Sequence, residues 1–255
     1  MNNRAFIIRI GANLKENKGL SPIFKDNTYE YIPSPLENTL NINKHHNHRH
    51  YSKMNCQNEH LVGMHMSSFV DEGTGHLDPE FYTFTYGETR APYITQLKKL
   101  KDGDMILFSI LLQKYDIKKD NFVLNGEPHI YILGFFTIHD VKNNIHEFQG
   151  PFTESSIKGF EKNCNEHIIY RNNHISTPGN KKLLLIQGDK NHSIIFKTPF
   201  RISKEEKIQS KIAKRWGIDA SPKSMQLNWC QNIENIKNDL YDHGNLNRWL
   251  EWNIP

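Results

Sequence analysis

Two long apolar runs constrain the fold more than any other feature of the sequence: MILFSILLQ at Met105–Gln113 and HIYILGFFTIHDV at His129–Val141. Both are almost continuously apolar, rich in Ile and Phe, and of strand length. A strand that is apolar without alternation is typically covered on both faces. We therefore predict that the two runs are neighbouring core strands. Gly134, inside the second run, predicts a bulge or a close approach of another backbone, although packing of a large neighbouring side chain explains it equally well.

Shorter segments add to this core. The apolar, β-branched run RAFIIRI at Arg4–Ile10 predicts a first core strand. Ile94, Leu97 and Leu100 recur at helical spacing, which predicts a short helix just before the first long run. A Lys-Asp-Gly-Asp turn then separates this helix from the strand.

The remaining elements lie toward the C-terminus. Lys181–Asp189 and His192–Phe200 predict two strands joined as a hairpin. Ser203 followed by Glu206 resembles a capping box, and we predict a helical C-terminal part over residues 203–255. Strands come first and helices last, which indicates the α+β class rather than alternating βαβ units. The sequence has no internal repeat, and we predict a single domain over residues 1–255.

Residues 41–58 interrupt this pattern with a polar segment, NINKHHNHRHYSKMNCQN, that has four histidines in six positions. Because it lacks an apolar period, it predicts a flexible insertion. Neutral imidazoles also suit Zn²⁺ and Ni²⁺. A structural metal site, however, needs ligands held on rigid elements by second-shell partners, and HHNHRH offers neither. We therefore predict no metal site, and no motif in the chain indicates a cofactor.

Composition excludes several classes of protein. The chain has 255 residues, of which 37% are hydrophobic, with 14 Phe, 10 Tyr and 4 Trp, too many core-forming residues for a disordered chain. No apolar stretch reaches membrane-spanning length and the start lacks a signal h-region, so we expect a cytoplasmic protein with no membrane partner. Three separated cysteines without a CxxC pair indicate neither a disulfide framework nor a cysteine zinc site. The net charge of +4 permits a polyanionic partner without requiring one.

The side chains best suited to binding or catalysis are concentrated in HLDPEFYTFTYGETR, at His76–Arg90. The common signatures GxGxxG, GxxxxGK[ST], GxSxG and HExxH are absent from the sequence. This stretch combines three carboxylates with hydroxyls, aromatics, a histidine and an arginine, and such a loop can hold a base or sugar by stacking and charge-assisted hydrogen bonds. The alternative is structural: Phe81, Phe84 and Tyr86 pin a long loop onto the core while the charged groups face water.

Candidate residues fall into two roles. General acid-base chemistry needs a titratable pair that reaches one bond, and the catalytic candidates are Glu88, Glu80 and His76. Loops at the ends of core strands often carry sites, and the first strand ends at such a loop. The ligand-binding candidates are Arg9, Asn13, Asp78, Thr85, Tyr86, Gly87 and Arg90.

Several short motifs occur in order: FIIRIGAN, YEYIPSP, HLDPEFYTFTYGE, QLKKLKDGDMILF and YILGFFTI. Together they resemble the nucleotide modification associated domain 3 family over residues 6 to about 250. The chain departs from the family pattern at Asn13, where an acidic residue is expected, and at Glu88, where Asp is more usual. The resemblance implies association with enzymes that build or handle modified DNA bases. The LKKLKDGDMILF element is also similar to a turn and strand of PUA, ASCH and EVE domains, which implies a PUA-like mixed β-barrel core with long loops.

Three functions stay open on these grounds. The first is a module that binds a modified base or nucleotide in a pocket formed by residues 76–90, in a DNA or RNA base modification or defence pathway. The second is an enzyme that acts on a nucleotide or modified base by carboxylate acid-base chemistry. The third is an adaptor for partner proteins of a modification system. The sequence predicts a nucleic acid or nucleotide partner and no particular oligomeric state.

Overall fold

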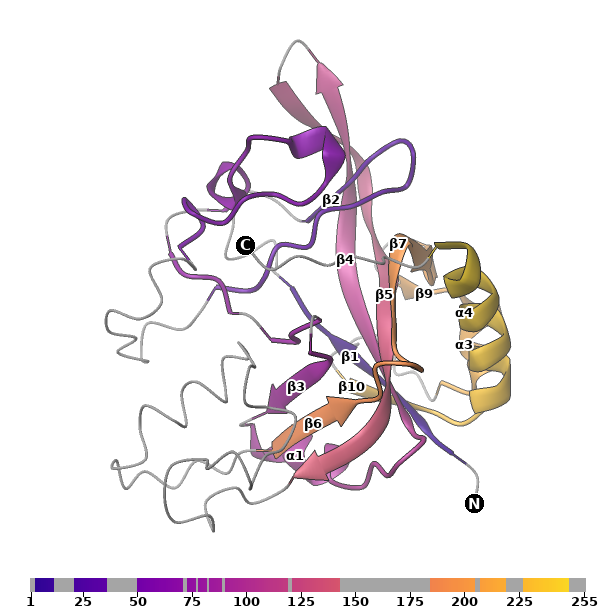
Figure 1. The fold of residues 1–255 in the computed structure, drawn as a ribbon. Coiled ribbons are helices and arrows are strands. Elements are labelled where there is room, and N and C mark those ends of the chain that lie inside the picture. The colour runs from indigo at the N-terminus through magenta and orange to yellow at the C-terminus, as the bar shows by residue number, and fades with distance from the viewer. Residues whose placement is uncertain are drawn as a thin grey trace, which may run out of the picture.

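The computed structural model describes residues 3–11, 21–35, 50–70, 73–76, 78–81, 83–88, 90–118, 121–142, 184–204, 207–218 and 227–247. Its centre is an antiparallel pair of long strands, β4 (Met105–Lys118) and β5 (Asn121–Lys142). They run through the middle of the molecule in Figure 1. The prediction that the two apolar runs are neighbouring core strands is confirmed. Both strands extend beyond the apolar runs, because their ladder continues to Lys118 and Asn121.

The described strands form an eight-stranded mixed sheet in which shorter strands line the two outer edges of the β4–β5 pair. β1 and β2 lie parallel to successive parts of β4, while β6 and β7 lie antiparallel to successive parts of β5. β10 pairs with β1 and β3 pairs with β6, so these two strands end the main order. The bounds are β1 Ala5–Arg9, β2 Ser21–Ile23, β3 Thr85–Glu88, β6 Leu184–Gly188, β7 Ile194–Arg201 and β10 Leu227–Cys230.

The sheet is open among the strands that the structure describes. Its order is β10-β1-β4-β5-β6-β3, and no ladder joins the two end strands β10 and β3. The α+β class is therefore confirmed, whereas the closed PUA-like barrel is not found. The resemblance to PUA domains rests on the turn and first residues of β4, and a segment of that length does not determine how the other strands close.

Both faces of the central strands are covered. On β4, Ile106, Phe108 and Ile110 belong to one apolar cluster, while Met105 and Leu107 belong to the cluster on the other face. This period of two explains why the run reads as continuously apolar. The first face is covered by the segment around Phe81 and by helix α1 (Ala91–Leu97). The second face is covered by helices α3 (Ser210–Trp216) and α4 (Ile233–Asn247).

A bulge in β5 changes which residues face which side. Ser109 lies opposite Ile132 and Phe108 lies opposite Gly134, so Leu133 is the extra residue. Gly134 allows β7 to approach closely, because a Cβ atom there would lie 2.2 Å from the carbonyl oxygen of Ile194. The prediction of a bulge or close backbone approach at Gly134 is confirmed.

The predicted hairpin between β6 and β7 is wrong. β6 pairs with β5 at Ile138–Lys142 and β7 pairs with β5 at Tyr131–Phe135, so the two strands lie in line along one edge. The connecting turn also binds β5, since Asp189 N–H donates to Thr137 O at 2.8 Å. The turn at Gly188 and Asp189, where the sequence predicts a reversal of the chain, thus connects two strands that run in the same direction.

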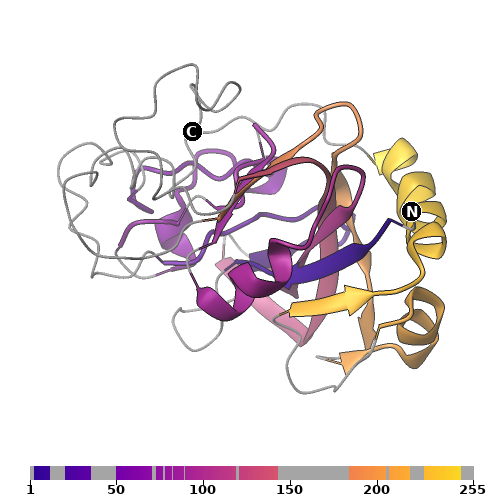
Figure 2. The ribbon, with the colours of Figure 1, turned by 90° about the horizontal axis from the view of Figure 1, so that it is seen from below.

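The described helices are short, except for the last. α1 is Ala91–Leu97, α3 is Ser210–Trp216 and α4 is Ile233–Asn247, with 3-10 turns η2 at Glu59–Leu61 and η3 at Met66–Ser68. Seen from below in Figure 2, α3 and α4 lie together at one side of the sheet, apart from α1. The helix predicted from Ile94, Leu97 and Leu100 corresponds to α1, which begins at Ala91 and ends at Leu97.

The start of the C-terminal helix differs from the prediction. Ser203 lies in β8 (Ser203–Lys204), which pairs with β9 (Lys207–Ile208), and α3 begins only at Ser210. The Ser203 hydroxyl accepts the N–H of Ile130 at 2.6 Å, so it serves the sheet rather than a helix N-terminus. None of the helices in the described part of the chain has the length and apolar character needed to span a bilayer.

The end of the histidine-rich segment packs as part of the structure. Residues 41–49 lie outside the described residues, but Tyr51 and Met54 are buried in a third apolar cluster with Phe24, Ile32 and Phe69. The hydroxyl of Tyr51 donates to Pro33 O at 2.8 Å. Residues 50–58 are thus tied to the segment around Ile32.

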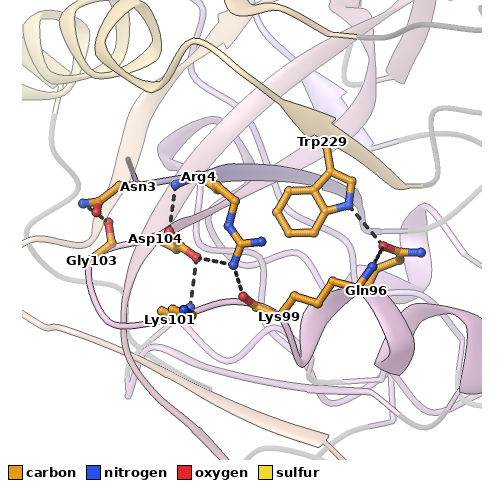
Figure 3. A network of polar contacts seen from close by, with 8 residues as sticks. All are labelled: Asn3, Arg4, Gln96, Lys99, Lys101, Gly103, Asp104 and Trp229. Carbon is orange, nitrogen blue, oxygen red and sulfur yellow. Dashed lines mark hydrogen bonds and ion pairs between the residues drawn. The ribbon is translucent and has the colours of Figure 1, made fainter. Parts of the chain in front are cut away.

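A polar network fixes the starts of β1 and β4 (Figure 3). The buried Asp104 carboxylate accepts the N–H of Arg4 at 2.7 Å and the N–H of Lys101 at 2.9 Å. The guanidinium of Arg4 forms an ion pair with Asp104 at 3.3 Å and lies 5.0 Å from the centre of the Trp229 ring. The Gly-Asp turn before the first long apolar run therefore joins β1, β4 and β10.

Candidate functional site

Residues 78–88 form a compact fold-back against the first face of the sheet. Glu80 and Thr85 exchange backbone hydrogen bonds at 2.8 and 3.0 Å, and the chain then enters β3. The ring of Phe81 contacts the rings of Tyr31, Phe108 and Phe136 at centroid distances of 5.5, 5.7 and 6.0 Å. Aromatic side chains thus hold this segment on the core, as the structural alternative expected.

Asp78 closes this fold-back from one end. Its buried carboxylate accepts the N–H of Gly87 at 2.8 Å. It also lies near Tyr31: burial first, and the charge of Asp78 second, raise the pKa of the Tyr31 hydroxyl well above its usual range. The Asp78 carboxylate is therefore bonded to β3 and close enough to Tyr31 for its charge to act on that hydroxyl.

Glu80 braces the tip of the fold-back. Its buried carboxylate accepts both the N–H, at 3.2 Å, and the hydroxyl of Thr83. The Thr83 and Thr85 hydroxyl oxygens lie 3.2 Å apart, so Thr85 joins the same group of polar atoms. Both threonines are buried. This arrangement holds the backbone turn, in which Phe84 has a positive φ of 56°.

Glu88 links the buried cluster to the surface. Its side chain is 3% exposed and accepts the Tyr86 hydroxyl at 2.8 Å and two guanidinium nitrogens of Arg90, at 2.9 and 2.8 Å. The Arg90 side chain is 57% exposed and its guanidinium carbon lies 3.8 Å from the centre of the Tyr93 ring. Hydrogen bonding to Glu88 raises the pKa of Arg90. Arg90 is thus a charged group of fixed orientation at the surface.

The end of β1 reaches the same region through residues 31–35. The Ser34 hydroxyl donates to Gly11 O at 2.7 Å, and the N–H of His76 donates to Ser34 O at 2.7 Å. A Cβ atom on Gly11, which has a φ of +82°, would lie 3.5 Å from Ile32 O and 2.6 Å from Ile110 Cδ1. Only a glycine therefore fits at this junction.

Most of the predicted site residues lie together in the structure. The fold-back brings together Asp78, Glu80, Thr85, Tyr86, Gly87, Glu88 and Arg90, as described above. His76 joins this group through its backbone, and the partly buried Arg9 ends β1 next to the chain that leads to Gly11. Asn13 lies outside the described residues.

Sequence reasoning did not include Tyr31 and Ser34 among the candidate residues, although both contact the 76–90 segment. Tyr31 contacts Phe81, and Ser34 bridges Gly11 and His76. The signal was available in YEYIPSP, a motif that carries the family resemblance but does not by itself indicate a place in the site. Its proximity to the 78–88 segment depends on tertiary contacts, which the sequence alone does not reveal.

The protein thus has an α+β fold with an open mixed sheet. The segment of residues 78–88, with its buried carboxylates and Tyr86, packs against the first face of this sheet. The chain belongs to the nucleotide modification associated domain 3 family, whose model matches residues 4–252. The resemblance inferred from the motifs is therefore confirmed, and family membership indicates a role in nucleic acid modification pathways. Neither the curated proteins nor the solved structures contain a match to this chain.

Proposed function

We propose that the chain binds a nucleotide or modified base at the surface where the 76–90 segment, residues 31–35 and the end of β1 meet. One observation carries the proposal: three motifs that are distant in the sequence converge there. Tyr31 contacts Phe81, and Ser34 hydrogen-bonds both to Gly11 O and to the N–H of His76. These motifs also carry the family resemblance, so their convergence supports this part of the fold as the binding site.

The hydrogen bonds of the carboxylates favour binding over catalysis. Asp78 accepts from Gly87, Glu80 accepts from Thr83, and Glu88 accepts from both Tyr86 and Arg90. A general base needs a lone pair directed at the proton that it removes. These buried carboxylates instead hold the shape of the segment. The enzyme hypothesis would require at least one of them to exchange its partner for a substrate.

Arg90 is the residue of the cluster best placed to contact a ligand. Its guanidinium is fixed on one edge by Glu88 and on one face by Tyr93, while more than half of the side chain is exposed. A pre-oriented guanidinium loses little conformational entropy on binding a phosphate or stacking on a base. We infer that Glu88 orients Arg90 and that Arg90 makes the contact.

The test uses nucleoside and nucleotide digests of modified and unmodified DNA. The digests are incubated with the protein, and mass spectrometry then identifies both the retained and the converted species. We expect one or more species to be retained unchanged by the wild type and retention to fall about tenfold in Arg90→Lys, which keeps the charge but loses the planar fork.

Arg215→Lys is the matched control. Arg215 also forms a two-pronged ion pair, with Asp239 at 2.8 Å, but it lies on α3. Equal loss in both variants, or no retention by the wild type, would contradict the proposed site. Conversion of a nucleoside that stops in Glu80→Gln or Glu88→Gln would instead support the enzyme hypothesis. If the protein neither retains nor converts any species, the result would favour the adaptor hypothesis.

A further inference from the structure

One group of metal-ligating side chains lies outside the site described above. Within the described residues, Asp26, Glu59 and His60 each offer one ligand atom, and these atoms all lie within 4.8 Å of one another. Asp26 belongs to the turn after β2, and the other two residues begin η2. The nearest pair, His60 Nε2 and Asp26 Oδ2, is 2.8 Å apart.

The two closest ligands are oriented by neighbours that do not belong to the group. The second oxygen of Asp26, Oδ1, accepts the N–H of Thr28 at 2.9 Å and its hydroxyl at 2.8 Å, which directs Oδ2 toward His60. The His60 ring packs on Phe24 with centroids 4.8 Å apart. Ligand carboxylates and imidazoles in metal sites are commonly held by such outer contacts.

The backbone that carries Glu59 and His60 is anchored to the buried part of the protein. Asn58, directly before them, is buried and donates its N–H to Glu30 Oε2 at 2.8 Å and its side-chain amide to Tyr29 O at 3.1 Å. Its side-chain oxygen accepts the N–H of His60 at 2.9 Å. The turn that bears the two ligands is therefore fixed relative to residues 26–30.

We propose that Asp26, Glu59 and His60 bind a divalent transition-metal ion of the Zn²⁺ class. Ligand bonds of about 2.0–2.2 Å place neighbouring ligand atoms roughly 3–3.5 Å apart, so the Asp26–His60 pair needs little change and Glu59 has to close only a short gap. An imidazole ligand favours Zn²⁺ over Mg²⁺ or Ca²⁺, which prefer oxygen atoms alone. All three residues are exposed, so water completes the coordination.

The same criterion that argued against the HHNHRH tract favours this site, because rigid elements and outer-shell partners are present here. Bound metal would join the turn after β2 to η2. Both elements flank Tyr29–Ile32, which leads into the proposed nucleotide-binding surface. The metal site does not depend on that function.

The experiment separates this site from the histidine tract. In a full-length background with His45, His46, His48 and His50 replaced by Gln, Zn²⁺ binding is measured by calorimetry and Tm is measured with and without ZnCl₂. We expect about one equivalent of Zn²⁺ and a Zn²⁺-dependent rise in Tm. His60→Gln and Asp26→Asn should each weaken binding by about tenfold or more and abolish the rise in Tm.

His65→Gln is the matched control, because His65 is an exposed histidine of the same segment outside the group. It should bind Zn²⁺ as the background does. Glu59→Gln, at an exposed position, gives a second reading if either main variant is poorly folded by circular dichroism. The proposal is overturned if the background binds no Zn²⁺, or if the affinity of a folded His60→Gln or Glu59→Gln equals that of His65→Gln.

Discussion

The carboxylate of Asp78 accepts the N–H of Gly87 at 2.8 Å. This bond joins the two ends of the stretch from Asp78 to Gly87 and satisfies a donor on β3, the strand that ends the main sheet order. At Gly87 the edge strand thus bonds to a side-chain carboxylate, while at Thr85 it bonds to the backbone of Glu80. Edges left open are prone to pair with other chains.

Asp78→Ala should therefore destabilise the protein. The buried Gly87 N–H would lose its acceptor, at a cost of about 1–3 kcal/mol. Urea denaturation followed by fluorescence measures the change in unfolding free energy. Asp102→Ala is the control, because the Asp102 side chain is 84% exposed and its removal should change stability by less than about 0.5 kcal/mol. Equal stability of the two variants would mean that the bond does not hold the segment.

Tyr86→Phe and Glu88→Gln test the orientation of Arg90. Both proteins should fold, since size and shape are kept, but each variant weakens the Tyr86–Glu88–Arg90 chain of hydrogen bonds. We expect retention of nucleosides from the DNA digest to fall roughly tenfold, equivalent to about 1.4 kcal/mol. Tyr241→Phe, on α4, is the control and should retain them fully. Normal retention by both stably folded variants would place the binding site elsewhere.

Gly134→Ala should be among the most damaging small substitutions. The added Cβ atom would lie 2.2 Å from Ile194 O and 2.9 Å from Ile195 Cα, and backbone atoms within a sheet cannot easily move. We expect a loss of about 1–3 kcal/mol or more in thermal or urea unfolding.

Gly244→Ala provides the contrast, because its Cβ atom would meet side-chain atoms of Phe196 and Ile194 at 3.0 and 3.2 Å. There a helix-propensity gain of about 1 kcal/mol offsets the tight contact. If both alanine variants were equally stable, the close approach of β5 and β7 at Gly134 would not constrain the residue.

The central strands could be predicted because burial on both faces leaves a direct mark on the sequence. Met105–Gln113 and His129–Val141 are apolar at nearly every position, whichever face each residue occupies. The connection between β6 and β7 could not be predicted in the same way. A turn around Gly188 can reverse the chain or continue it in line, and the outcome depends on β5, a partner distant in the sequence.

Side-chain partners are harder to predict than side-chain types. Ser203 has the sequence pattern of a helix cap, but a tertiary acceptor role toward Ile130 prevails. The carboxylates and hydroxyls of the 76–90 segment stand out from composition, whereas their pairing depends on a backbone reversal that brings Glu80 beside Thr85. Tyr31 escapes prediction for the same reason, since only the folded chain places it against Phe81.

The lysines around the end of α1 predict salt-dependent binding to nucleic acid. Lys98, Lys99 and Lys101 are exposed, and lysines that neutralise phosphates release counterions. We expect binding to a labelled single-stranded oligonucleotide to weaken as salt rises, with a smaller logarithmic slope in the triple Gln variant. The slope should fall by about 0.7 for each phosphate that the variant no longer neutralises.

Lys211→Gln with Lys214→Gln, both on α3, is the control and should keep the wild-type slope. Fluorescence anisotropy at several salt concentrations measures both. An affinity that does not change with salt, or an equal change in the two variants, would contradict a role for the α1 lysines.

Glu30 predicts a pH dependence of stability. Burial is the main cause that raises the pKa of its carboxyl to about 7, against two backbone donors, Gln57 and Asn58, that act to lower it. Its other oxygen, Oε1, is buried without a hydrogen-bond partner among the described residues. The folded protein therefore holds a proton that the unfolded chain, with a pKa near 4.5, releases earlier.

Stability from the Glu30 carboxyl is therefore full below about pH 4.5 and is lost as pH rises toward 7, by at most about 1.4 kcal/mol per pH unit. In Glu30→Gln the side chain cannot ionise. The unfolding free energy of the wild type relative to this variant should therefore fall as the pH rises from about 4.5 to 7, and should stay constant above about pH 7. Urea unfolding at pH 5, 6, 7 and 8 measures this difference, with Glu127→Gln, at an exposed position, as the control that should follow the wild type. A difference that is constant with pH would mean that Glu30 is ionised throughout.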